Sequence, residues 1–403
     1  MATRDHAWST SPLLRSRSDE SAARRRAEEL RWPELLIFAL FPLEVIPLFG
    51  IGLPLNESAA VLLILIALTR RPEADLRIPG WFLGLTSLLW LILLYSSYIN
   101  DLAPVRRLGH VGIVIVLAIM IASGRVHARS GAVGLAVGLT IGGVWGLITL
   151  GQSSYVGRLT GFFGDPNVAG MFVVVYGAII LSFVRSWALR APLMAGLLLL
   201  LVQTYSRTSW LAAGFLVIWV VIGRRVAPTF GALLLGGLIW ATEAIPQDVK
   251  QSGQFADRAG SDELRARIEA QEVIDVARAP WFGNGAGSAM VEINDDSFFY
   301  HSSYLAIRAE GGYAAMVTLI VLVILVFLAA HRLPFPNRAP WLEGAIIASM
   351  VCAMNIGEAL LAFPLWIALG LTLRHTLSVR AEEAPPPGEA TARAITPGFP
   401  RVR

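Results

Sequence analysis

The stretch LLLLLVQTYSRTSWLAAGFLVIWVVIG, residues 197–223, decides the fold. It is apolar almost throughout, and about 20 such residues in a row are enough for a helix to cross the hydrocarbon core of a bilayer. The polar group YSRTSW, residues 205–210, interrupts it at the centre. The pattern predicts two membrane-spanning helices joined by a short polar turn that contains Arg207.

The composition of the chain extends this interpretation to the whole protein. Of 403 residues, 55% are hydrophobic and only 15% are charged, which excludes a soluble globular protein and favours a polytopic membrane protein. The formal net charge of +4 does not indicate nucleic-acid binding, because the arginines are spread over short loops. The single cysteine, Cys352, lies in an apolar run, so no intrachain disulfide is possible.

Apolar runs of helical length, broken at glycine, proline and charged residues, predict an all-α membrane protein of about twelve spans. A polar segment at about 244–298 separates the ninth and tenth spans, and its residues 261–280 predict an amphipathic helix that ends before Pro280. The predicted spans are 33–51, 57–69, 79–97, 108–124, 131–151, 167–184, 190–204, 208–223, 228–243, 299–330, 340–356 and 359–375.

Arginine placement predicts the orientation of these spans, because cytoplasmic loops carry an excess of Lys and Arg. With residues 24–26 in the cytoplasm, the predicted cytoplasmic loops are all arginine-bearing, and only Arg106-Arg107 lies on the wrong side. We therefore expect a basic cytoplasmic tail at 1–32, a membrane domain at 33–378 and a disordered cytoplasmic tail at 379–403. Both termini are expected in the cytoplasm, and the segment 244–298 is expected outside.

This orientation gathers cationic side chains at the outer face. Guanidinium groups make bidentate contacts to phosphate oxygens, so the candidate ligand is a phosphate-bearing lipid such as a polyprenyl diphosphate. Plainer alternatives stay open: a merely interfacial position for Arg207, an ion pair of Arg267 with Glu263, and structural roles for Arg158 and His301. The outer residues are Arg158, Arg207, Arg258, Arg265, Arg267 and Arg278, with His110 and His301.

Further charged residues lie in or beside predicted spans. Arg308 shares the face of His301 about two turns deeper, where a charge is costly unless paired or functional. Glu310 is its candidate partner. Glu44, in the first predicted span, is either a buried counter-ion or a catalytic group. The pair Asp295-Asp296 is interpreted as a solvated turn in preference to a metal site, and the sequence contains no zinc-type cluster, P-loop or serine-nucleophile motif.

Four blocks of the sequence resemble the O-antigen ligase and O-antigen polymerase superfamily. They are RLTGFFGDPN (158–167), YSRTSW (205–210), RIE (267–269) before PWFGNG (280–285), and HSSYL (301–305) before EG (310–311). Their order and their placement around one large outer loop also match, over about 155–330. The sequence departs from the family pattern at Asp165, Gln271 and Ser302.

The resemblance implies a glycosyltransferase at the outer side of a bacterial cytoplasmic membrane. Such an enzyme moves a glycan from an undecaprenyl-type diphosphate carrier to a glycan, lipid or protein acceptor, without a metal or other cofactor. Fixed guanidinium charges suit a diphosphate leaving group, and an imidazole, with an unperturbed pKa of about 6.5, suits removal of a hydroxyl proton. The implied site comprises His301 as the base, Arg207, Arg267 and the weaker addition Arg158 at the diphosphate, and Ser206, Tyr304, Arg308 and Glu310 in support.

The sequence leaves two alternatives open. A ligase and a polymerase need the same diphosphate site and the same base, so the motifs do not separate them. A flippase for lipid-linked oligosaccharide, or another secondary transporter, also has about twelve spans, but it predicts repeats and charged residues near the bilayer midplane. The polar blocks here cluster on one side, which favours the transferase.

Overall fold

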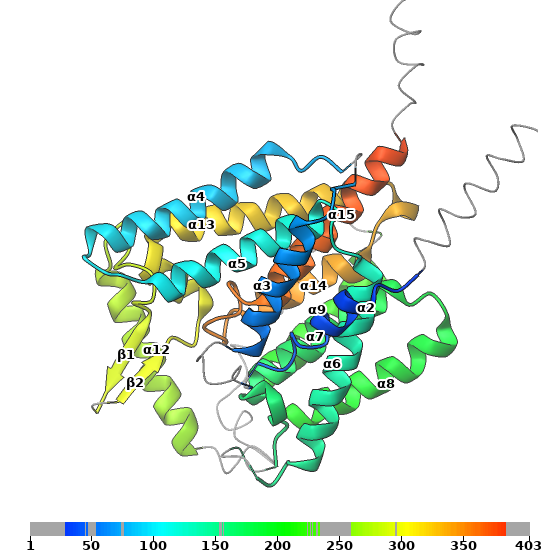
Figure 1. Ribbon diagram of the computed structural model, residues 1–403. Helices are drawn as coiled ribbons and strands as arrows, with labels where there is room; N and C mark the ends of the chain where they lie inside the picture. Colours follow the sequence, from blue (N-terminus) through cyan, green and yellow to red (C-terminus); the bar gives the residue numbers. More distant parts are fainter. Residues whose placement is uncertain are drawn as a thin grey trace, which may run out of the picture.

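The protein, seen in a computed structural model, is a bundle of helices (Figure 1). The structure describes residues 29–44, 54–73, 76–152, 157–223, 259–294 and 296–383, with a few isolated positions between these ranges. Its helices are α2 (Trp32–Phe38), α3 (Leu55–Leu68), α4 (Gly80–Ile99), α5 (Val105–Ala122), α6 (Ala128–Ile148), α7 (Pro166–Phe183), α8 (Trp187–Thr204), α9 (Arg207–Ile218), α12 (Ala259–Arg278), α13 (Ser303–His331), α14 (Pro340–Cys352) and α15 (Phe363–Glu383). Short 3-10 helices cover Gly161–Phe163 and Phe335–Asn337, and a π-helix covers Trp219–Gly223.

Six of the described helices are long and apolar enough to cross a membrane: α4, α5, α6, α7, α8 and α13. Three further apolar helices, at Leu55–Leu68, Arg207–Gly223 and Pro340–Cys352, are shorter. This confirms a helical membrane protein. It does not support twelve spans.

The differences from the predicted spans have local causes. The first predicted span, 33–51, is wrong over its described part, because α2 ends at Phe38 and the chain turns through 39–42. Pro42 has no N–H for a continuing helix. The ninth predicted span, 228–243, lies largely outside the described residues, as do most of the N-terminal tail and residues 384–403. At the other end, α15 continues to Glu383, past the predicted start of the tail at 379.

Helices α7, α14 and α15 form the centre of the bundle. Helix α14 packs on α7 and α9, while α15 packs on α5, and almost every residue from Phe363 to Leu373 is buried. Helices α4, α5 and α13 lie side by side along one edge of the molecule (Figure 1). Helix α8 lies at the opposite edge, with only Leu201 and Thr204 buried.

The predicted outer segment contains more regular structure than expected. The amphipathic helix expected over 261–280 is α12. It is followed by an antiparallel hairpin of β1 (Met290–Ile293) and β2 (Asp296–Phe299), in which Met290 pairs with Phe299 and Ile293 with Asp296. The hairpin is an addition to the all-α prediction, and it packs against α12 to form a small second core with Ile268 and Val291.

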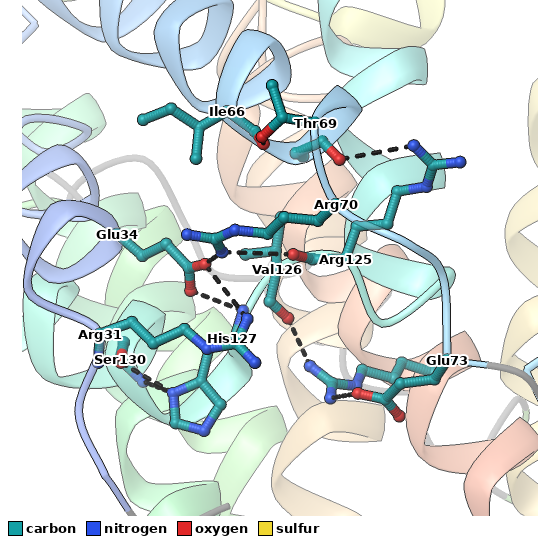
Figure 2. A network of polar contacts seen from close by, with 12 residues as sticks. Arg31, Glu34, Ile66, Thr69, Arg70, Glu73, Arg125, Val126, His127 and Ser130 are labelled. Atoms are coloured by element: carbon teal, nitrogen blue, oxygen red, sulfur yellow. Dashed lines mark hydrogen bonds and ion pairs between the residues drawn. The ribbon is translucent and has the colours of Figure 1, made fainter. Parts of the chain in front are cut away.

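A buried carboxylate holds together the end of the bundle at which α2 begins. The side chain of Glu34 is fully buried, accepts a hydrogen bond from the backbone N–H of His127 at 2.6 Å and pairs with Arg70 (Figure 2). Arg70 in turn lies 3.4 Å from the carbonyl oxygen of Arg125. One side chain of α2 therefore ties together the end of α3 and the turn between α5 and α6. We call this the Glu34 end.

Candidate functional site

The opposite end of the bundle, where α13 begins, carries His301. A carboxylate from α12 caps this helix: Glu272 accepts the backbone N–H of His301 at 2.6 Å and that of Ser302 at 3.4 Å. The Nδ1 atom of His301 is buried and lies 3.7 Å from the same Glu272 oxygen, while 27% of the histidine side chain stays exposed. Nδ1 has no hydrogen-bond partner among the described residues, so Glu272 is a charge next to the ring and not a hydrogen-bond acceptor for it.

Glu272 is a candidate residue that the sequence analysis missed. Leu264, Ile268 and Glu272 recur at intervals of one helical turn, and Ile268 and Glu272 are buried. A carboxylate in the middle of an apolar stripe is the signal that could have found it. Burial, followed by the negative charges of Asp275 and Glu272, raises the pKa of the neighbouring Tyr300 to about 12, so this phenol stays protonated near neutral pH.

A break in α13 explains the block EGG at 310–312. Gly312 adopts φ 71° and ψ −169° within the helix, and the loop after α12 fills the gap. Asn284 and Gly285 donate their N–H groups to the carbonyl oxygens of Ala309 and Glu310, at 2.7 and 3.0 Å. The backbone of the glycine-rich loop thereby replaces the helical hydrogen bonds that the break removes.

Arg308 supports this loop and does not pair with Glu310, so the predicted ion pair is wrong. Its Nη1 and Nη2 atoms donate to the carbonyl oxygens of Pro280 and Ala279, both at 2.9 Å. Its guanidinium carbon lies 3.9 Å from the centre of the Tyr313 ring. Two carbonyl groups and an aromatic face partly compensate this buried charge, while its Nε atom has no hydrogen-bond partner among the described residues.

Glu310 instead pairs with Arg107, the residue that conflicted with the predicted orientation. The Nη2 and Nε atoms of Arg107 each lie 3.1 Å from a Glu310 oxygen, and Nη1 contacts Glu358. Arg107 thus joins the start of α5 to α13 and to the turn before α15. Its charge is compensated by two carboxylates, so it is not available as a simple cation at this surface.

The turn between α8 and α9 carries Arg207 and Ser206. Tyr205 takes the left-handed conformation with φ 48°, and Ser206 caps α9 by accepting the N–H of Ser209, so the chain reverses over two residues. Arg158 packs on this turn, with its Nε atom donating to the carbonyl oxygen of Thr204 at 3.0 Å. The blocks at 158–167 and 205–210 are therefore neighbours in space.

The first block also approaches α12. Tyr155 is hydrogen-bonded to Asp165 and lies within electrostatic range of Arg158 and of Arg265 on α12. Burial, and then the charge of Asp165, raises the pKa of the Tyr155 hydroxyl. Asp165 itself caps α7 by accepting the N–H of Asn167 at 2.7 Å.

Helix α14 contacts both the region of the blocks at 158–167 and 205–210 and the region of the blocks at 267–285 and 301–311. Trp219, just after α9, donates to Glu343 near the start of α14 at 3.0 Å, so α9 and α14 pack in opposite directions and Ser209 at the start of α9 lies toward the C-terminal end of α14. At that end, Ala353 accepts the backbone N–H of Ser303 at 2.9 Å. Arg207 precedes Ser209 by two residues, and His301 precedes Ser303 by two. Both therefore lie around the same end of α14. Tyr304 also contacts this helix, donating to the carbonyl oxygen of Met350 at 2.9 Å.

The side chains that the sequence assigned to a diphosphate differ in exposure. Arg207 and Arg267 are exposed, and Arg158 is half-buried. Among the described ion pairs none joins Arg267 to Glu263, so that alternative is not observed. The cationic side chains and the N-termini of α7, α9 and α13 occur at one end of the bundle, an arrangement suited to an anion.

The other acidic candidates are Glu44, Asp295 and Asp296. Glu44 follows α2 in a turn, within electrostatic range of His110, Glu57 and Glu358. The side chain of Asp296 is exposed on β2, and Asp295 lies outside the described residues. Within the described ranges, no group of three or more His, Cys, Asp or Glu side chains is placed to hold a metal ion.

The fold and the site together define a polytopic helical membrane protein with a histidine, a buried carboxylate and several arginines near one end of its bundle. Comparison of the sequence with known protein families finds no matching family, and comparison with curated proteins finds no match either.

Proposed function

We propose that the protein is a membrane glycosyltransferase of the O-antigen ligase or polymerase type, in the cytoplasmic membrane of a bacterium. It transfers a glycan from a polyprenyl diphosphate carrier to an acceptor hydroxyl on a glycan, lipid or protein. In the proposed topology, both termini are cytoplasmic and the end that carries His301 faces outward. The observation that carries the proposal is the 3.7 Å approach of the His301 Nδ1 atom to the buried Glu272 carboxylate.

The chemistry follows from this pair. Nδ1 of His301 is buried beside Glu272, so Nε2 is the ring nitrogen proposed to accept the proton of the acceptor hydroxyl. The hydroxyl oxygen forms a bond to the anomeric carbon, while the bond between that carbon and the diphosphate oxygen breaks. Attack from the face opposite the leaving group inverts the anomeric centre, and the electron pair leaves with the lipid diphosphate.

Arg207, Arg267 and Arg158 are proposed to hold that diphosphate. Its negative charge increases as the glycosidic bond breaks, so fixed guanidinium groups stabilise the transition state more than the bound donor. Ser206 supports the site by capping α9, which begins at Arg207. Tyr304 supports it by binding the start of α13 to α14. No metal or other cofactor is part of the proposed mechanism.

The test is transfer by the purified protein in liposomes that contain a lipid-linked glycan donor. We expect His301→Ala to lower the transfer rate by about 10²- to 10⁴-fold while donor binding is retained, because only proton removal is lost. His6→Ala, in the predicted cytoplasmic tail, is the control and should leave the rate unchanged. A His301→Ala protein with full activity would contradict the proposal.

The same assay examines the arginines. Arg207→Lys keeps the charge but loses bidentate contacts, so its transfer rate should fall, and that of Arg207→Ala should fall further.

In cells, the lipid-linked material that accumulates when the gene is deleted separates the alternatives: single repeat units indicate a polymerase and long chains indicate a ligase. Material trapped on the cytoplasmic leaflet would indicate the flippase instead.

A further inference from the structure

A large cavity opens between the helices at the Glu34 end, away from His301. Its volume is about 1530 Å³, larger than the roughly 300–1,000 Å³ of pockets for drug-sized ligands. It is lined by the first halves of α6 and α8, the last turns of α7 and α9, the start of α14 and the second half of α15. No function proposed above uses this cavity.

The mouth of the cavity is cationic. The described lining residues include Arg129, Arg185, Arg190, Arg338, Arg374, His127 and His375, and no Asp or Glu. Arg338 and Arg374 are compensated by Glu343 and Glu73, at 2.6 and 2.5 Å.

Arg185 and Arg190 form no ion pair with any residue that the structure describes. Arg185 is exposed at the end of α7. Arg190, in the first turn of α8, lies over the Trp341 ring at 5.9 Å and approaches the carbonyl oxygen of Leu181 at 3.5 Å. Its Nε atom is buried and has no hydrogen-bond partner among the described residues. Two guanidinium groups that line the cavity without a carboxylate partner among the described residues favour an anionic ligand there.

The walls of the cavity are apolar. Leu193 and Met194 of α8 face it, together with Val137 of α6, Val217 of α9 and Val221 of the π-helix that follows α9. The three valines are between 40 and 64% exposed. Since α8 buries only Leu201 and Thr204, at its far end, the cavity separates its first half from the bundle.

We propose that this cavity binds an anionic phospholipid, with the phosphate at Arg185 and Arg190 and the acyl chains along the apolar walls. The cationic mouth matches a phosphate headgroup, and Trp187 and Trp341 beside it are typical of the membrane interface. A free phosphate ion would leave the valine walls exposed, whereas acyl chains cover them. The lipid thus fills the space between α8 and the bundle.

The test is native mass spectrometry of the full-length protein in detergent, titrated with phosphatidylglycerol and with phosphatidylcholine of the same acyl chains. We expect phosphatidylglycerol to bind more tightly. The double variant R185Q/R190Q should lose at least about tenfold of that affinity, because two charge-assisted contacts are removed. The matched control is R77Q/R332Q, which removes two exposed arginines at the same end, outside the cavity, and should bind as the unchanged protein does.

A second variant tests the acyl chains. Val137→Trp fills the cavity from its exposed wall and should weaken phosphatidylglycerol binding while leaving the thermal unfolding temperature unchanged. Equal binding of the two lipids, equal losses in the cavity and control variants, or displacement of the lipid by inorganic phosphate would each overturn the proposal. The measurement involves no glycan transfer, so its outcome is independent of the proposed activity.

Discussion

At the scale of one residue, the buried carboxylate of Glu272 distinguishes His301 from an ordinary histidine at a helix start. A histidine at a helix start is in itself unremarkable, and the sequence left a structural role for His301 open. The buried carboxylate changes this, because it binds the backbone N–H of His301 and lies 3.7 Å from its ring. The same side chain therefore binds the start of the helix and places a negative charge next to the imidazole.

Replacement of Glu272 tests this positioning role, which rests on the proposed function. Glu272→Gln keeps a carbonyl acceptor for the helix but removes the charge behind the ring. We expect kcat for glycan transfer to fall by about tenfold to a hundredfold, less than for loss of the base itself, with KM for the donor unchanged. Steady-state kinetics in liposomes provides the measurement.

Asp275 offers the matched control. It lies on the same helix but accepts a hydrogen bond from Gln271 at 2.7 Å. Asp275→Asn should therefore leave kcat nearly unchanged. If Glu272→Gln raised KM and lowered the unfolding temperature without an effect on kcat, the carboxylate would be only structural.

At the scale of one element, α13 is a helix broken at a defined place. The break at Gly312 frees carbonyl groups that the loop at 281–285 then binds, and Gly283 makes the contact possible. Gly283 has φ 79°, and an added Cβ atom would lie 2.6 Å from the Ala309 oxygen. Gly283 and Gly312 thus allow the loop at 281–285 to pack closely on α13. This packing keeps the loop, and α12 before it, next to the start of α13 at His301.

Because the backbones at Gly283 and Gly312 are in close contact, a single added methyl group at Gly312 should destabilise the fold. In Gly312→Ala the new Cβ atom would lie 1.8 Å from the Trp281 carbonyl oxygen, at a φ of +71° that alanine rarely adopts. We expect a loss of about 1–3 kcal/mol in the free energy of unfolding, seen as a lower thermal unfolding temperature in detergent. Gly196→Ala on α8 is the control, since an added Cβ atom there has nothing within 4 Å. Equal unfolding temperatures for the two variants would contradict the role of the joint.

At the scale of the whole molecule, polar contacts join the helices at both ends of the bundle. Arg107 joins α5, α13 and the turn before α15, and Glu34 joins α2, α3 and α6. Burial of a charge is costly unless it is paired, so each network holds only when all its helices are in place. These contacts specify which helices become neighbours, while apolar packing between them is less selective.

Because Glu34 is buried and Glu73 is half exposed, replacing Glu34 should destabilise the protein more than replacing Glu73. Glu34→Ala leaves the buried backbone N–H of His127 without its acceptor and Arg70 without its carboxylate, and we expect a loss of about 2 kcal/mol in the free energy of unfolding. Glu73, which pairs with Arg374 but has 49% of its side chain exposed, is the control. Its replacement by Ala should cost less than about 1 kcal/mol. Thermal unfolding in detergent compares the two, and an equal shift would contradict the importance of burial.

The sequence by itself determined the helical membrane class, because length and apolarity of a segment decide whether it can cross a bilayer. It also predicted α12 and the polar turn at 205–210, since caps and periodicity are local signals. It failed where helices are short or broken, as at α2, because apolar composition does not reveal where a helix ends. Only the tertiary structure decided that Glu310 pairs with Arg107, that Glu272 lies beside His301, and that the starts of α9 and α13 lie near one end of α14. These contacts join residues distant in the chain, and their energy depends on burial, which no local pattern records.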